Sequence, residues 1–290
     1  MKRLKGKVAV ITGAANGLGR ALAERAAQEG MKVVLADIDK KNLAQVEKAL
    51  TASGATVLAV MTDVSKLEDV QALVKKTLDK FGAVHLVCNA AAVHCPKPLV
   101  QTTLADWKWV EGVNLYGPIH TLAILVPIMM EQDTECHIVN VAPVYGGFYS
   151  LPFNGAYNVS EYGVVTMSEV LFIEMSDKHP KIGVTLLAPD YADPAILDSE
   201  KYRPAELRDA AGEEAEAIPH ADEIKGFIEA TSRAELSPER LAEMAFDAIR
   251  ENRFYVFPHP GSKVLMRERF AHIDQQSNPV NILQLMGLAS

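Results

Sequence analysis

The sequence predicts an α/β fold, a doubly wound parallel sheet of seven strands with helices on both faces and an inserted helical lid. Short apolar, β-branched runs alternate with longer helical patterns from the first residues onward, which is the rhythm of repeated strand–helix–strand units. The 290 residues are 49% hydrophobic, enough for one sizeable core. We therefore expect right-handed crossovers and a sheet that is covered on both faces.

Each strand is predicted from a run of apolar and β-branched residues that ends at turn residues. Such runs occur at 7–12, 32–37, 56–64, 84–90, 137–142, 184–189 and 254–258. The segments between them have helical spacing, at 17–30, 42–54, 67–81, about 103–132, from about 157, and 237–252. The last of these helices begins with Ser-Pro-Glu, which is a helix-start signal.

Residues 1–290 are expected to form a single domain. The stretch 198–230 breaks the strand–helix rhythm, because it is acidic and interrupted by Pro204 and Pro219. It is predicted to be a helical lid insertion. Residues 261–290 are predicted to be a C-terminal extension with one amphipathic helix at roughly 262–276 and a mostly apolar end.

The composition argues against several classes of protein. A net charge of −8 without a dense Lys/Arg stripe makes nucleic acid an unexpected partner. The first apolar run ends at Thr12, too short for a signal segment or a membrane span, so we expect a cytoplasmic protein without a membrane partner. The three cysteines fit reduced core thiols. His94 beside Cys95 lacks a second spaced pair of ligands, and no metal site is expected.

A glycine-rich turn lies between the first predicted strand and the first helix. Gly13, Gly17 and Gly19 have the spacing G-x-x-x-G-x-G, with Asn16 and Leu18 beside the second glycine. Glycine permits a tight turn and close backbone approach to a pyrophosphate, and the helix N-terminus supplies N–H groups and a positive dipole. The alternative is a turn without a ligand. The position of the glycine-rich turn between a strand and a helix favours a dinucleotide-binding (Rossmann) site.

Asp37 ends the second predicted strand, 18 residues after Gly19. In dinucleotide folds an acid at this point holds the adenosine ribose hydroxyls, and it repels a 2′-phosphate. No Arg or Lys lies in the loop before Gly17, so NAD is predicted rather than NADP. Ile38, next to the acid, is assigned to the same cofactor site. The alternative role for Asp37 is to cap the following helix.

These residues resemble the fingerprint of the short-chain dehydrogenase/reductase family, and the resemblance runs from around Lys5 to Pro258. Thr12-Gly13-x-x-x-Gly17-x-Gly19 matches the glycine motif of that family. The resemblance implies further cofactor-binding and family positions, namely Asp63 and Val64 at the adenine, Asn89, Ala90 and Ala91 where the family has Asn-Ala-Gly, and the helix asparagine Asn114.

The resemblance also implies a Ser-Tyr-Lys set, in which Tyr exchanges the proton, Lys lowers the pKa of Tyr, and Ser holds the oxygen. Tyr157 is present, but Glu161 occupies the lysine position and Pro143 the serine position. Residues i and i+4 share a helix face, so Glu161 is expected near Tyr157, where an anion disfavours the phenolate. A buried, protonated Glu161 would remove this repulsion. Tyr145 is a substitute oxygen donor only if it points inward.

Two kinds of function stay open. The first is an NAD(H)-binding oxidoreductase that acts on a hydroxyl or carbonyl through an altered proton relay, with Tyr157, Asn114 and Glu161 as catalytic residues. The second is a non-catalytic NAD-binding subunit that pairs with an intact family member; a redox-neutral lyase or isomerase on this fold is a further alternative. The aromatic segment 147–153 favours a small apolar or aromatic substrate. The resemblance implies a homodimer or homotetramer.

Overall fold

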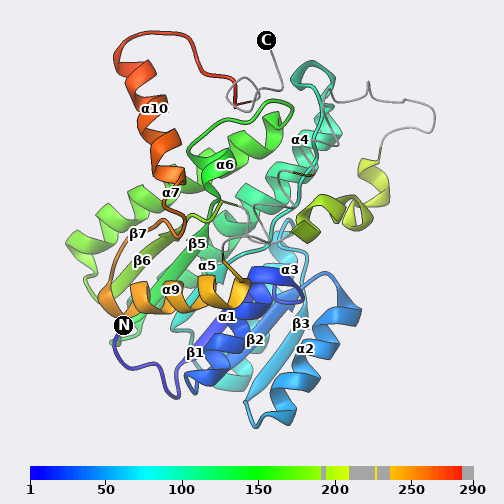
Figure 1. Ribbon diagram of the computed structural model, residues 1–290. Coiled ribbons are helices and arrows are strands. Elements are labelled where there is room, and N and C mark those ends of the chain that lie inside the picture. The colour runs from blue at the N-terminus through cyan, green and yellow to red at the C-terminus, as the bar shows by residue number, and fades with distance from the viewer. Residues whose placement is uncertain (191–193, 209–225, 227–235, 283–290) are drawn as a thin grey trace.

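The computed structural model describes residues 1–190, 194–208, 226 and 236–282 (Figure 1). Seven parallel strands form one sheet in the order β3-β2-β1-β4-β5-β6-β7. The doubly wound sheet and all of its predicted strands are confirmed. The strands are β1 (Val8–Thr12), β2 (Lys32–Asp37), β3 (Val57–Met61), β4 (Leu86–Asn89), β5 (Cys136–Val141), β6 (Ile182–Leu187) and β7 (Tyr255–Val256).

The winding direction of the sheet changes between β1 and β4. From β1 the chain adds strands outward to β3, and it then returns to add β4 on the other side. Strands β1, β4 and β6 are buried along their whole length, as expected of parallel strands with both faces covered. In open α/β sheets ligands bind beyond the carboxyl ends of the strands at such a switch point.

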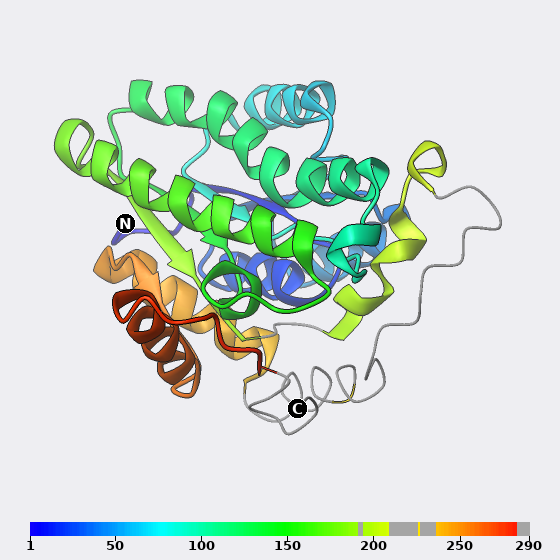
Figure 2. The ribbon, with the colours of Figure 1, turned by 90° about the horizontal axis from the view of Figure 1, so that it is seen from above.

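Helices cover both faces of the sheet, with α1 and α9 on one side and α5 and α7 on the other (Figure 2). The first face also carries α2, and the second carries α3. Leu22 and Phe246 are fully buried on the first face, and Leu73 and Met129 on the second. The bounds are α1 (Gly17–Gln28), α2 (Lys40–Ala52), α3 (Leu67–Phe81), α5 (Gly117–Glu131), α7 (Gly155–Lys178) and α9 (Pro238–Glu251).

Side-chain caps fix where several helices begin. Asp39 accepts a hydrogen bond from the N–H of Asn42 at the start of α2, and Ser237 accepts one from Arg240 at the start of α9. Such caps satisfy N–H groups that have no partner inside the helix. The alternative that Asp37 caps α2 is therefore wrong, because Asp39 does so.

The long helix predicted at 103–132 is one continuous helical stretch with a π-helical turn in its middle. It consists of α4 (Leu104–Glu111), the π turn η2 (Gly112–Tyr116) and α5. Such π turns occur frequently at functional sites, and this one carries Asn114. Leu104–Glu131 is also long and apolar enough, by length and composition alone, to cross a membrane. Leu125 is fully buried against the sheet, which is the packing of a core helix.

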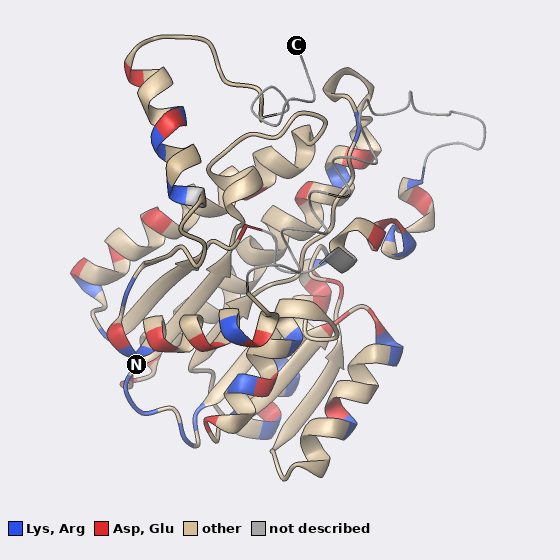
Figure 3. Cartoon of the chain, in the orientation of Figure 1, with Lys and Arg blue, Asp and Glu red and all other residues tan. Residues whose placement is uncertain are grey.

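Charged side chains lie mainly on the outer helices, where both signs are interspersed, while the strands carry few of them (Figure 3). A helix in the C-terminal extension is confirmed as α10 (Ser262–Asp274). Beyond it, the Tyr149 hydroxyl donates to the Val280 carbonyl at 3.1 Å.

The predicted lid at 198–230 is described at 198–208 and at residue 226, and in the first of these parts the chain forms 3-10 turns in place of a regular helix. These turns are η3 (Pro194–Tyr202) and η4 (Ala205–Leu207). Residues 209–225 and 227–230 of the lid, and residues 283–290 of the C-terminal extension, lie outside the described residues.

Candidate active site

A groove runs along the carboxyl edge of the sheet, across the switch point between β1 and β4. The glycine-rich turn and the ends of β2 and β3 form one end of it, and residues of η2 and α7 form the other. The structure brings every predicted site residue to this groove. Its lining includes Gly13, Asn16, Gly17, Leu18, Gly19, Asp37, Ile38, Asp63, Val64, Asn89, Ala90, Ala91, Asn114, Tyr157 and Glu161.

The turn before α1 has a shape that only glycine allows. Gly13 and Gly17 have positive φ angles of 67° and 47°, where glycine meets no steric penalty. A Cβ on Gly19 would lie 2.1 Å from the carbonyl oxygen of Gly13. No side chain caps the first turn of α1, because the Asn16 amide oxygen accepts from Asn42 instead. Uncapped N–H groups at the groove fit a bound phosphate.

Asp37 lies at the end of β2 with both carboxylate oxygens held by the backbone. Oδ2 accepts from the N–H of Ala15 at 2.9 Å, and Oδ1 from the N–H of Asp39 at 2.8 Å. Burial raises the pKa of Asp37, although the two N–H groups oppose this effect. Each oxygen retains a lone pair for a ligand hydroxyl. The carboxylate is thus fixed in place beside the glycine-rich turn.

Asp63 and Val64 follow β3 and border the same end of the groove. Asp63 Oδ1 accepts from the backbone N–H and the hydroxyl of Ser65, at 3.1 and 2.6 Å. Val64 packs closely on Gly117, since a Cβ on that glycine would lie 2.8 Å from Val64 Cγ2. The absence of a side chain at Gly117 therefore lets α5 approach the loop after β3.

The segment after β4 is held by hydrogen bonds to β1 and β5. The Asn89 side chain donates to Asn140 Oδ1 at 2.8 Å and accepts from the Thr121 hydroxyl at 2.8 Å. The N–H groups of Ala90 and Ala91 donate to the Thr12 hydroxyl at 3.1 and 3.3 Å. Asn89 is thus a buried structural residue, and the two alanines line the middle of the groove.

Asn114 joins the π turn to the loop after β4 and to α7. Its Oδ1 accepts from the Val93 N–H at 2.8 Å, and its Nδ2 donates to the Val93 carbonyl at 3.0 Å. The same Nδ2 lies 3.4 Å from Glu161 Oε1. Asn114 therefore ties Glu161 to the chain segment that borders the groove.

Tyr157 and Glu161 lie on one face of α7, as their spacing predicts. A Cβ on Gly146 would lie 2.7 Å from the ring atom Cε1 of Tyr157 and 3.5 Å from Glu161 Cγ, so both side chains border this glycine. Glu161 is 2% exposed, and burial raises its pKa to about 8. It is therefore mainly protonated at neutral pH. Glu161 is thus a buried side chain and not a surface carboxylate.

Pro143 lines the groove at the position predicted for the family serine. It has no hydrogen to donate, and the neighbouring Ala142 has no polar side-chain atom. Tyr145 is buried but does not belong to the described lining of the groove. The described residues thus contain no hydroxyl at the serine position, and Tyr145 does not point into the groove to replace it.

His94 is a neighbour of Tyr157 that sequence reasoning missed. The two rings meet edge to face, with centroids 5.1 Å apart. The Asn154 amide donates to the Pro152 carbonyl and turns its oxygen toward His94 Nε2, which identifies Nε2 as the donor. Burial lowers the pKa of His94 to about 4 despite this bond. The ring is neutral, and no group of three metal-ligating side chains exists among the described residues.

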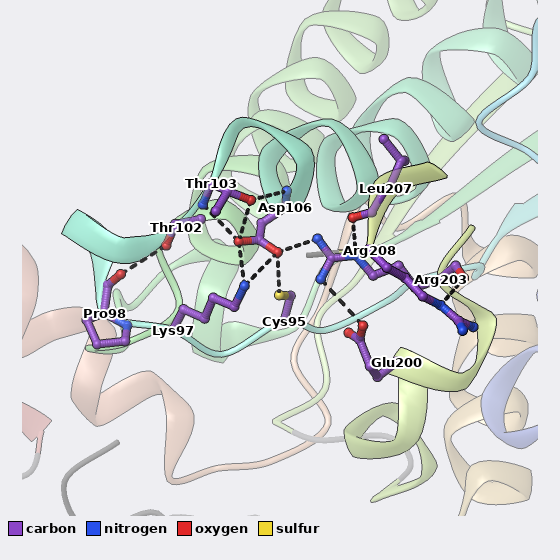
Figure 4. A network of polar contacts seen from close by, with 10 residues as sticks. All are labelled: Cys95, Lys97, Pro98, Thr102, Thr103, Asp106, Glu200, Arg203, Leu207 and Arg208. Carbon is purple, nitrogen blue, oxygen red and sulfur yellow. Dashed lines mark hydrogen bonds and ion pairs between the residues drawn. The ribbon is translucent and has the colours of Figure 1, made fainter. Parts of the chain in front are cut away.

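A buried ionic network beside the groove was also missed (Figure 4). Lys97 and Arg203 approach the fully buried Asp106 from opposite sides, and Thr103 donates to the same carboxylate from its N–H and its hydroxyl. Burial acts to raise the pKa of Asp106, but these hydrogen bonds outweigh it and hold the pKa below its ordinary value. Arg203 is 97 residues from Asp106, too far for local spacing to reveal the pair, whereas Thr103 and Asp106 form a capping box at the start of α4.

The chain is similar to known proteins over most of its length. Residues 7–204 match the family model described as short chain dehydrogenase. The chain is 30% identical over 281 residues to a CLA biosynthesis dehydrogenase/reductase of Lactiplantibacillus plantarum, which covers 96% of this chain and 97% of that protein. It is 28% identical over 284 residues to a C alpha-dehydrogenase of Sphingobium sp., with 97% and 89% covered.

A solved structure is also similar. It is a short-chain dehydrogenase/reductase from Burkholderia phymatum in complex with NAD, with a TM-score of 0.89 and 40% sequence identity. The match covers 97% of this chain and 99% of that one. The similarity therefore includes both ends of the groove.

Proposed function

The chain belongs to the short chain dehydrogenase family, and on that premise we propose that it is an NAD-dependent oxidoreductase in which Glu161 replaces the family lysine in proton exchange at Tyr157. One observation carries the proposal: a buried acid with a pKa near 8 lies on the same helix face as Tyr157, in a groove shaped for a dinucleotide. The 40% identical Burkholderia phymatum structure that contains NAD supports the choice of cofactor.

NAD, when bound, supplies the hydride acceptor or donor. The N–H groups at the start of α1 would hold its pyrophosphate, and Asp37 would hold the adenosine ribose. Asn114 keeps Glu161 at the opposite end of the groove. These groups are fixed by their own backbone contacts before any ligand arrives, which favours binding in a single orientation.

The proton path uses two side chains of α7. During alcohol oxidation the substrate hydroxyl would give its proton to Tyr157 as Tyr157 gives its own to ionised Glu161, and Glu161, which lines the groove, would then release that proton to water before the next turnover. Carbonyl reduction would run the same path in reverse. A pKa near 8 lets Glu161 accept and return a proton close to neutral pH. In this proposal the carboxyl group of Glu161 accepts and returns the proton itself, whereas the family lysine lowers the pKa of the tyrosine through its positive charge.

The substrate is proposed to be a small apolar or aromatic molecule with a hydroxyl or carbonyl group. At the reactive end the groove is lined by apolar side chains, which are Val93, Trp109, Val113 and Ile196. An apolar pocket with a few polar groups at one point fixes the orientation of such a ligand. Tyr157, Glu161 and Asn114 are polar groups of the lining there.

The proposal is tested by following NADH absorbance while NAD+ and a panel of aromatic and aliphatic alcohols are offered to the protein. Tyr157→Phe is expected to lower turnover at least about 100-fold, since it removes the proton-transferring hydroxyl. Tyr162→Phe is the control, because Tyr162 lies on the same helix but outside the groove lining. Equal turnover in Tyr157→Phe and wild type would refute the proposal. NAD binding without turnover in the wild type would favour the non-catalytic subunit.

Cofactor choice gives a second prediction. NADPH is expected to bind at least about tenfold more weakly than NADH, because its 2′-phosphate would approach the fixed carboxylate of Asp37. Fluorescence titration with NADH and NADPH measures the ratio directly. Tighter binding of NADPH would show that Asp37 does not face the adenosine ribose.

A further inference from the structure

Glu161 lies at the reactive end of the groove and has no counter-ion among the described residues. It lines the groove and is 2% exposed. Its Oε1 lies 3.4 Å from the Asn114 amide nitrogen, which is an uncharged donor. Burial alone accounts for the raised pKa of Glu161, so no charged side chain of the described chain stabilises its anion. The acid therefore keeps its proton at neutral pH for want of a nearby positive charge.

The elements around Glu161 supply no such charge. They carry phenols, a neutral imidazole and one paired carboxylate, which are Tyr157 on α7, Tyr116 on η2, Tyr145 after β5, His94 after β4 and Asp106 on α4. The helix α4 also carries the exposed Lys108 and Glu111, and both lie outside the described lining of the groove. Within the described chain, a positive charge beside Glu161 is thus left to a ligand.

The other charged groups of the groove lie at its adenosine end. Asp37 and Asp63 are there, and Lys201 is the one cation in the described lining. Lys201 Nζ lies 4.9 Å from the centre of the Tyr202 ring, and the Tyr202 hydroxyl donates to Asp39 Oδ2 at 2.8 Å, just before α2. This cation is therefore placed away from the reactive end.

We propose that Glu161 makes the groove select the oxidised form of the cofactor, because it releases its proton to solvent when NAD+ binds and keeps it when NADH binds. The inference rests on the proposed NAD-binding function and deepens it. The nicotinamide ring of NAD+ carries a positive charge that NADH lacks, and the ring belongs at the end of the groove opposite the adenosine. Ionised Glu161 therefore gains a counter-ion from NAD+ alone. A lysine at this position would have the opposite preference.

The proton of the relay consequently leaves at a defined step. Glu161 is ionised once NAD+ is in place, and this is the form that accepts a proton from Tyr157 during alcohol oxidation. After hydride transfer the ring is neutral, so protonated Glu161 is the stable form beside NADH. Exchange of NADH for NAD+ then releases that proton to solvent. Each turnover thus removes one hydride and one proton from the alcohol, and the carboxyl group returns to its starting state.

Calorimetric titration with NAD+ in two buffers that differ in their heat of ionisation, PIPES and imidazole, counts the protons released on binding. An opposite charge nearby lowers the pKa of a carboxyl group by about 1–3 units, which from a pKa of about 8 gives about 0.4–0.9 proton released per NAD+ at pH 7. NADH is expected to release essentially none. By the same linkage, the affinity for NAD+ is expected to rise roughly tenfold or more between pH 6 and pH 9.

Two variants assign the proton. Glu161→Gln is expected to abolish the proton release and to flatten the pH dependence of NAD+ affinity, because its amide does not ionise. Glu174→Gln is the matched control, since it removes an exposed carboxylate of the same helix outside the groove lining, and it is expected to release protons as the wild type does.

The outcomes separate this inference from the proposed function. Equal proton release in wild type and Glu161→Gln would overturn the selection of NAD+ by Glu161 and leave NAD binding standing. Binding of NAD+ by the wild type without proton release would do the same. No binding of NAD+ or NADH by the wild type would overturn both.

Discussion

Glu161→Gln is expected to raise the free energy of unfolding at pH 7 by about 3 kcal/mol, a gain that should disappear as the pH falls toward 4.5. The reason is the cost of keeping a carboxyl group buried without a cation. Burial raises the pKa of Glu161 from 4.5 to about 8, so the folded protein keeps a proton that the unfolded chain releases between these values. Stability therefore falls as the pH rises through this window.

The stability gain of Glu161→Gln depends on pH in a defined way. Below pH 4.5 Glu161 is protonated in both the folded and the unfolded state, so it does not lower the free energy of unfolding. Above pH 8 the loss of unfolding free energy levels off near 5 kcal/mol, since each unit of pKa difference corresponds to about 1.4 kcal/mol. The glutamine side chain of the variant is neutral at every pH and keeps the oxygen that accepts from Asn114. The variant is therefore expected to lack this part of the pH dependence.

Urea unfolding at pH 5, 7 and 9 measures the effect. Glu174→Gln is the control, because Glu174 is an exposed carboxylate on the same helix, and surface substitutions of this kind change stability by at most about 0.5 kcal/mol. An unfolding free energy with the same pH dependence in wild type and Glu161→Gln would contradict a buried, protonated Glu161.

Asp106→Ala is expected to destabilise the fold by about 3–5 kcal/mol, the range for breaking a buried ion pair. The carboxylate is the shared acceptor for Lys97, Arg203 and Thr103. Without it the Arg203 side chain, 2% exposed, keeps only the exposed Glu200 as an ionic partner among the described residues. A charge that is left in the interior without a close counter-ion accounts for most of the loss.

The control for this variant is Asp79→Ala. Asp79 pairs with Lys75 at 2.6 Å, but both side chains are more than half exposed, and such pairs contribute at most about 1 kcal/mol. Urea unfolding at pH 7 compares the two variants. A loss in Asp106→Ala no larger than that in Asp79→Ala would mean that the network is not buried in solution.

Local patterns predicted most of the fold and the cofactor end of the groove. The spacing of Gly13, Gly17 and Gly19 predicts the glycine-rich turn before α1, because the conformation of that turn is determined by a few adjacent residues. The i, i+4 spacing likewise places Glu161 beside Tyr157, and the structure agrees. Burial of Glu161 was not predictable, since it depends on what the rest of the chain packs over α7.

Contacts between distant segments were not predictable. Asp106 and Arg203 are 97 residues apart, and Asp39 and Tyr202 are 163 apart. The spacing around Asp106 shows only its capping box with Thr103, and no local spacing pairs Asp106 with Arg203 or Asp39 with Tyr202. The π turn at Asn114 was hidden for a different reason, because one extra residue in a turn barely changes the periodicity of a long apolar helix.

The most direct test of the central claim is calorimetric titration of the purified protein with NAD+ and NADH, with nicotinamide absorbance then followed in the same sample as alcohols and ketones are added. We predict saturable binding of about one dinucleotide per chain, as one groove with a single glycine-rich turn implies, followed by turnover. No binding of either form would contradict the assignment of the groove to NAD(H), and with it the proposed function.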